Sequence, residues 1–164
     1  MAAYHKSFGV NTDAKPTFAD VTDKVEKIVA DSGISSGLVT VYSQHTTCSV
    51  MIQEEAHDST YNGTKYILQD LLDVFQNIIP RCRKEGDYLH PGPEHIKDAV
   101  SRDELPVWSL NTDAHLRSCL MGRSEAIPLV DGKLELGEFG EIYFIDFDSV
   151  RARERTVRIQ IIGE

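Results

Sequence analysis

The stretch AIPLVDGKLEL, residues 126–136, decides how the C-terminal third of the chain folds. Two β-prone runs flank Asp131-Gly132, a dipeptide that favours the tight turn of a β-hairpin. Further along the chain, residues 141–147 and 156–162 have the same β-rich character. The sequence therefore predicts four strands in this third of the chain, over 126–130, 133–136, 141–147 and 156–162.

Upstream of these strands the pattern predicts two helices and two further strands. Apolar residues at positions 21, 25, 28 and 29 form one face of a helix over residues 21–30. A longer helix is predicted over residues 59–79, because Pro80 ends its run of apolar residues. Between the two helices, residues 38–43 and 48–52 are typical of strands.

The polar segment 81–103 is predicted to be a long functional loop with one short helical turn. A structureless connection of this length is uncommon in a compact domain and usually carries a site. A short strand over 107–110 and a short helix from Asn111 to Gly122 follow it. We therefore expect one α+β domain over residues 1–164, with largely antiparallel β layers and two main helices.

Composition excludes several classes of function. The formal net charge of −9 argues against a nucleic-acid partner, because phosphate backbones need a basic surface. A few local arginines can still hold a small phosphorylated molecule on an acidic protein. No apolar run approaches the length of a membrane span, and the first residues lack the apolar core of a signal peptide. We therefore expect a cytoplasmic protein with no membrane partner. The three cysteines form no CxxC pair, so we expect reduced thiols.

Three histidines lie at junctions between the predicted elements: His45 after a strand, His90 in the long loop, and His115 at the start of a helix. Imidazole is the commonest zinc ligand, and catalytic zinc typically has three protein ligands and one open position. Spacing alone leaves a second interpretation open, because histidines also serve as ordinary hydrogen-bonding groups. Glu54 and Asp113 lie near two of these histidines and would orient a ring or act as a general base, or else be solvated surface acids.

A second set of residues points to a phosphate-binding site. Asn111 lies at a predicted helix start, where backbone N–H groups favour an anion. Arg117 follows in the same helix, and Arg151 lies near the C-terminus. Arginine matches the geometry of phosphate well. The alternative is that these arginines make surface ion pairs, which contribute little to stability.

Five ordered segments resemble motifs of the YjbQ family. The likeness covers nearly the whole chain from about residue 20 onward. In chain order, the segments are Gly37-Leu38-Val39-Thr40-Val41 with His45-Thr46-Thr47, Tyr88-Leu89-His90, Asn111-Thr112-Asp113-Ala114-His115, Leu134-Glu135-Leu136-Gly137, and Ile142-Tyr143-Phe144 with Phe147-Asp148 and Arg151-Ala152-Arg153. The chain departs from the family pattern at Gln53, Glu55 and Phe139-Gly140, and its segment 91–110 is longer than the family pattern. The roles of those residues and of that segment stay open.

The resemblance implies a homotrimer of α+β subunits and a thiamine-phosphate synthase activity that is often described as secondary. That reaction joins a hydroxymethylpyrimidine pyrophosphate to a thiazole phosphate and releases pyrophosphate. It needs a divalent metal ion, zinc or magnesium, or arginines to neutralise the departing pyrophosphate. Because His45, His90 and His115 all lie inside family motifs, the resemblance favours one shared metal site built from these three residues.

Three functions are therefore open. The first is a transferase of thiamine-phosphate synthase type. The second is a metal-dependent hydrolase of a phosphorylated small molecule, with Glu54 or Asp113 as its base. The third is a non-catalytic trimeric module that binds a small anion.

Overall fold

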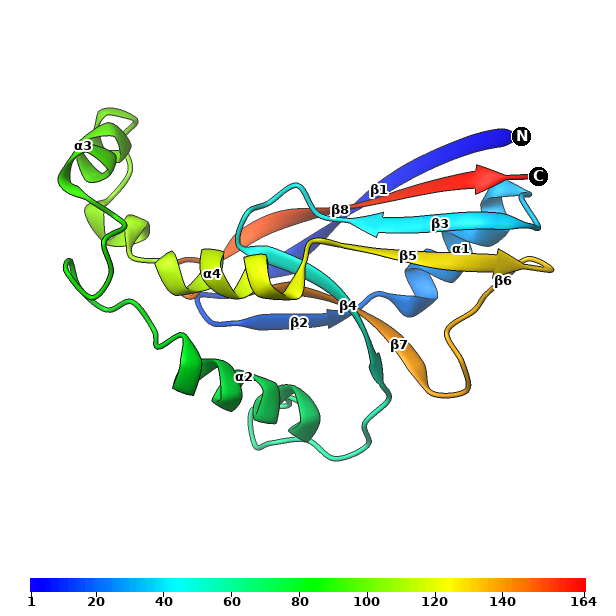
Figure 1. The fold of residues 1–164 in the computed structure, drawn as a ribbon, viewed down its shortest axis with the longest axis horizontal. Helices are drawn as coiled ribbons and strands as arrows, with labels where there is room; N and C mark the ends of the chain where they lie inside the picture. The colour runs from blue at the N-terminus through cyan, green and yellow to red at the C-terminus, as the bar shows by residue number, and fades with distance from the viewer.

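Two antiparallel sheets form the frame of the molecule, in a computed structural model that describes residues 1–164 (Figure 1). The larger sheet has five strands in the order β1-β8-β3-β5-β6, and the smaller has three in the order β2-β7-β4. The strands are β1 (Ala2–Thr12), β2 (Thr17–Asp20), β3 (Gly37–Tyr42), β4 (Cys48–Glu54), β5 (Ser124–Val130), β6 (Lys133–Leu134), β7 (Gly140–Asp146) and β8 (Arg153–Gly163).

Strand β7 is buried on both of its faces. Its residues Ile142 and Phe144 belong to the core between the two sheets, whereas Tyr143 and Ile145 belong to a second core on the far side. Neighbouring side chains of a strand point to opposite faces, so a continuous apolar run is what a strand covered on both faces requires. The smaller sheet is therefore the middle layer of the molecule.

Helices occupy both cores. Helix α1 (Thr22–Ser32) contributes Val25, Ile28 and Val29 to the core between the sheets. Helices α2 (Tyr66–Ile78) and α4 (Thr112–Met121) cover the other face of the smaller sheet. This arrangement confirms the predicted α+β fold. None of the helices has both the length and the apolar character that a membrane span requires.

Three elements of the first half differ from the prediction. The sequence pattern missed β1 and β2, although Phe8 and Val10 alternate with polar residues as a half-buried strand requires. Helix α2 begins at Tyr66 and not near residue 59, because Gly63 adopts a φ of +80° and residues 59–65 close a turn through a β-bridge from Ser59 to Lys65.

The long loop contains more structure than predicted. Helix α3 (Pro93–Ser101) has nine residues, with proline at its first position, where the missing N–H costs nothing. The predicted strand over 107–110 is wrong, because Pro106–Ser109 is the short 3₁₀ helix η1. A run of four residues is too short for its pattern of apolar and polar side chains to distinguish a strand from a helix.

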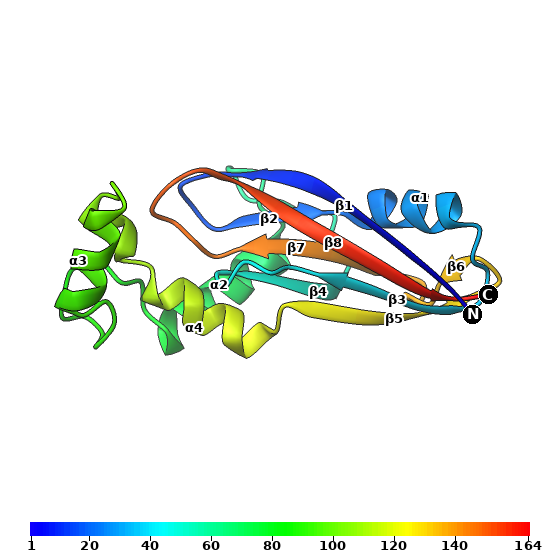
Figure 2. The same ribbon diagram turned by 90° about the horizontal axis from the view of Figure 1, so that it is seen from above.

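The outer face of the larger sheet carries no covering layer (Figure 2). Leu38 on β3 and Ile162 on β8 are paired neighbours in the sheet, and each side chain is 45% exposed. Both termini lie at one end of the sheets, and α3 lies at the opposite end. The candidate site lies at the end with α3.

Candidate functional site

A polar cleft of about 330 Å³ lies where five segments meet: the β3–β4 connection, the β7–β8 connection, the start of β8, the start of α4, and the segment containing α3 and η1. Trp108 is its one hydrophobic lining residue. The predicted site residues that line this cleft are His45, Asn111, His115 and Arg151.

Arginines enter the cleft from the inner face of β8. Val157, Ile159 and Ile161 alternate along this face and are buried in the core between the sheets. Arg155 and Arg153 continue the same alternation, so the inner face changes from aliphatic to cationic where the strand leaves the core. Arg151 extends the series just before the strand begins and lines the same cleft.

Carboxylates are buried beneath the arginines. Asp146 and Asp148 are both fully buried. Arg155 Nε donates to Asp146 Oδ2 at 2.6 Å, and Arg153 Nη2 lies 3.3 Å from Asp148 Oδ2. Thr47 Oγ1 donates to the other oxygen of Asp146 at 2.9 Å. The floor of the cleft is therefore an ion-paired network in which the charges largely offset one another.

His45 replaces a missing strand partner. Strand β3 ends at Tyr42, so the backbone N–H of Thr156 on β8 has no strand neighbour on that side, and it donates to His45 Nε2 at 3.1 Å. Burial and the charge of Arg155 lower the pKa of His45. A nitrogen that accepts a hydrogen bond is unprotonated, so His45 is a neutral imidazole with its proton on Nδ1.

His90, His95 and His115 form a group of imidazoles, of which His95 and His115 line the cleft and His90 does not. The ring centroid of His90 lies 4.4 Å from that of His95 and 6.1 Å from that of His115. Thr112 Oγ1 donates to the His90 carbonyl and ties this loop to α4. Burial lowers the pKa of both His90 and His115, so both rings are neutral at pH 7.

The predicted metal centre of His45, His90 and His115 does not fit this arrangement. The Nε2 atom of His45 is already the acceptor for the Thr156 N–H. Nowhere in the molecule do three His, Cys, Asp or Glu side chains converge in a way that would hold a metal ion. We therefore derive no catalytic step through a metal.

Asp113 and Arg117 lie outside the cleft. They are four residues apart on one face of α4, are buried, and face each other at 3.6 Å. Asp113 accepts a hydrogen bond from the Cys82 N–H at 3.1 Å, and Arg117 donates to the Ile79 carbonyl at 2.8 Å. His115 lies two residues from each, a rotation of about 200° around the helix, so it points to the other side. Both residues hold α4 against the loop that follows α2, and the structure does not bring Asp113, predicted as a base, or Arg117, predicted as an anion ligand, into the cleft.

Glu54 is also remote from the cleft. It is the last residue of β4 and is exposed, whereas His45 lies just before the first, Cys48. Six residue steps of about 3.3 Å separate the two ends of β4 by roughly 20 Å. The structure therefore gives Glu54 no part in this site.

The residues that line the cleft and were not among the predicted site residues include His95, Glu104, Trp108 and Arg155. Arg155 could have been found, because Arg151, Arg153 and Arg155 alternate as one strand face does. His95 lies in the segment 81–103 that was predicted to be a loop, Glu104 follows that segment, and Trp108 lies in the stretch 107–110 that was wrongly predicted to be a strand. No periodicity in these stretches shows which side chains point inward.

The fold and the cleft together define a class: a single-domain α+β protein of two antiparallel sheets, with a polar cleft lined by arginine and histidine. The model of one family, described as UPF0047 protein YjbQ-like, matches residues 6–164. The chain belongs to this YjbQ family, as the resemblance predicted.

Individual relatives agree with this assignment. The chain is 32% identical over 149 residues to a UPF0047 protein of Archaeoglobus fulgidus, covering 91% of this chain and 95% of the relative. It is 28% identical over 158 residues to the UPF0047 protein YugU of Bacillus subtilis, with coverages of 96% and 98%. The solved structure of the hypothetical protein APE1520 from Aeropyrum pernix matches with a TM-score of 0.73 at 29% identity, over 98% of this chain and 99% of that one. A YjbQ/UPF0047 family protein from Clostridium acetobutylicum matches with a TM-score of 0.71 at 30% identity, over 96% and 99%.

Proposed function

We propose that the cleft binds a phosphorylated small molecule, and that the protein is a transferase of thiamine-phosphate synthase type. The observation that carries the proposal is the convergence of Arg151, Arg153 and Arg155 on one cleft, beside the neutral imidazoles of His45 and His115. Guanidinium groups match the geometry of phosphate oxygens and stay charged at every physiological pH.

Two of these arginines have unused donors. The Nε atoms of Arg151 and Arg153 are excluded from solvent and have no hydrogen-bond acceptor. A buried donor without a partner costs about 1–3 kcal/mol. A small shift of either side chain toward a bound phosphate would give its N–H an acceptor, which favours an anion as the ligand. Arg155 differs, because Asp146 and Thr47 already take its donors.

The proposed reaction needs little from the protein beyond charge and position. The carbon–oxygen bond between the pyrimidine methylene group and pyrophosphate breaks, and its electron pair leaves with the pyrophosphate. The thiazole ring nitrogen forms the new carbon–nitrogen bond with its own lone pair. Negative charge builds up on the leaving group, where Arg151 and Arg153 would stabilise it.

A second candidate is hydrolysis of a phosphate ester. The lowered pKa of His115, caused by burial, leaves its imidazole neutral and able to take a proton from an attacking water. The third candidate, a non-catalytic module, would use the same arginines for binding alone.

Turnover assays with purified protein separate these candidates. We expect conversion of the two thiamine precursors, and a loss of about 10- to 150-fold in kcat/KM for Arg151→Met, since hydrogen bonds to charged groups contribute about 1.5–3 kcal/mol. Arg83→Met is the control, because Arg83 is an exposed arginine that lines neither the cleft nor the hollow on the outer face of the larger sheet. Hydrolysis of phosphate esters without synthesis would favour the second candidate, and binding without turnover would favour the third.

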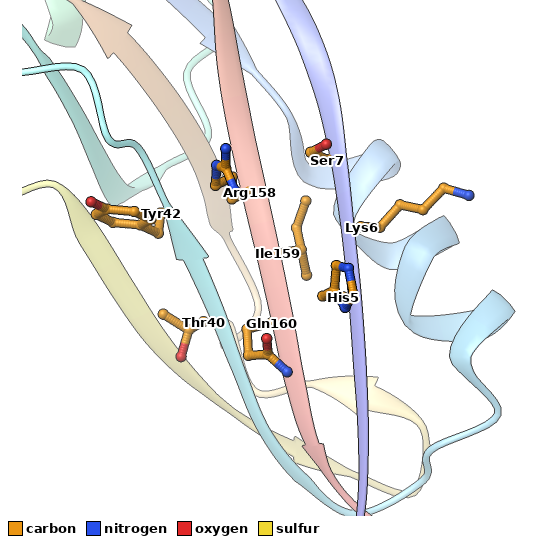
Figure 3. Close-up of a pocket in the computed structure, with 8 residues that line it drawn as sticks. All are labelled: His5, Lys6, Ser7, Thr40, Tyr42, Arg158, Ile159 and Gln160. Atoms are coloured by element: carbon orange, nitrogen blue, oxygen red, sulfur yellow. The ribbon is translucent and has the colours of Figure 1, made fainter.

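We also propose that copies of the chain assemble as a homotrimer through the outer face of the larger sheet. Figure 3 shows this face, where side chains of β1, β8 and β3 surround a hollow of about 280 Å³. Arg158 stands between Ser7 and Tyr42 in one row across the strands. The exposed Leu38 and Ile162 lie farther along the same face, and an uncovered sheet face with apolar side chains is typical of a contact between subunits. A cytoplasmic location is proposed from the three free cysteines.

A further inference from the structure

Arg151 is held on two sides by residues of one segment. Its Nη2 donates to Glu104 Oε1 at 2.9 Å. Its guanidinium carbon lies 4.1 Å from the ring centroid of Trp108. Glu104 and Trp108 both lie between α3 and the start of α4, and both line the cleft. The guanidinium is therefore fixed at one edge by a hydrogen bond and on one face by an aromatic ring.

This arrangement reduces the cost of binding an anion. A free arginine side chain has about 2 kcal/mol of rotamer entropy to lose when it is immobilised by a ligand. Where the guanidinium is already fixed, part of that loss has occurred before the ligand arrives. Arg151 is only 24% exposed, so its position in the cleft is set by these contacts and not by solvent.

Glu104 makes the arrangement testable, because charge and position predict opposite effects. Its carboxylate is a negative charge in a cleft that would receive a phosphate, so electrostatics alone predicts tighter anion binding when it is removed. If its main effect is to hold Arg151, then removing it weakens binding. The sign of the change in affinity decides between the two.

We propose that Glu104 and Trp108 are positioning residues that hold Arg151 for a phosphate or pyrophosphate group. The proposal rests on the proposed function of the cleft and deepens it, since it assigns a role to the segment that follows α3. Neither residue need touch the anion; both act through the guanidinium.

The test is a titration of the full-length protein with inorganic pyrophosphate. Trp108 is the only tryptophan in the chain, so its fluorescence reports on the ring that stacks on Arg151. We expect a saturable change in emission for the native protein and none for Arg151→Gln. Affinities of all variants are measured by calorimetry, so that the loss of the tryptophan does not remove the readout.

We expect Glu104→Ala and Trp108→Ala each to weaken pyrophosphate binding by about 3- to 10-fold, the equivalent of one immobilised side chain. Glu104→Gln keeps an acceptor without the charge and should restore the native affinity or exceed it. Trp108→Phe should restore most of the loss. The matched control is Glu94→Ala, which removes a charge from helix α3, just before this segment, at a residue that pairs with Lys97 and not with Arg151.

Two outcomes overturn the proposal in distinguishable ways. If the native protein binds no pyrophosphate, the proposed function of the cleft fails, and the role of Glu104 and Trp108 fails with it. If the native protein binds but Glu104→Ala binds equally well or more tightly, the positioning role alone fails. Circular dichroism checks the fold of each variant, and the Glu104 variants decide the matter even if Trp108→Ala unfolds.

Discussion

Replacing Arg155 by methionine tests whether the buried network beneath the cleft stabilises the fold. Arg155 is 5% exposed, and it is the shared partner of Asp146 and Asp148, which are fully buried. Arg155→Met leaves two buried carboxylates without this cation, and removing one partner of a buried ion pair costs about 3–5 kcal/mol. Unfolding entropy is about 2.1 cal/mol/K per residue, or about 0.34 kcal/mol/K for 164 residues, so the melting temperature should fall by about 9–15 °C.

Urea titrations of the native protein and the variant measure this loss directly as a change in the free energy of unfolding. The control is Arg83→Met, the same substitution at an exposed arginine outside the cleft and the proposed subunit contact, for which we expect a change within about 0.5 kcal/mol. A loss below about 1 kcal/mol for Arg155→Met would refute the reasoning, because the carboxylates would then be stabilised by other groups.

Three further predictions follow from the structure. Burial lowers the pKa of His115 below its ordinary 6.5, so its contribution to stability is complete above pH 6.5 and is lost as the pH falls through the folded-state pKa. Between about pH 7 and pH 5, the free energy of unfolding measured by urea titration should therefore fall less for His115→Gln than for the native protein. An equal fall in the two proteins would contradict this prediction. Because no three ligands converge on one point, adding EDTA should leave the midpoint of unfolding unchanged. Finding one equivalent of zinc in the purified protein, and losing that zinc in His90→Ala, would contradict this prediction. Light scattering should give about 55 kDa, three times the 18.4 kDa chain, and Ile162→Lys should shift the mass toward the monomer; a native mass near 18 kDa would contradict assembly.

The fold was largely predictable because most of its elements follow strong periodic patterns. Helix α1 and strands β3, β4, β5, β7 and β8 were predicted within a few residues of their bounds. The failures have local causes. Proline at the first position of α3 and of η1 permits a helix as well as a loop, and only tertiary contacts decide between them.

The site was predictable only in part, because sequence does not show which way a side chain points. Asn111 and Asp113 lie two residues apart, yet the first lines the cleft and the second is buried on the other side of α4. The family motif around His115 includes both Asn111 and Asp113, so it does not show which of the two side chains enters the cleft. Glu104 and Trp108 carry no motif, and they became visible only when the fold brought them to Arg151.

The pairing of β1 with β8 has a consequence for the kinetics of folding. Ala2 lies opposite Gly163, so one of the longest ladders in the molecule joins its first and last strands. Contacts between residues so distant in sequence require a large loop to close before they stabilise anything, and proteins dominated by such contacts fold in milliseconds to seconds. During synthesis, β1 has no partner until residues 153–163 have left the ribosome. The edge of β1 is therefore exposed longest, and a chaperone that shields extended segments would act there.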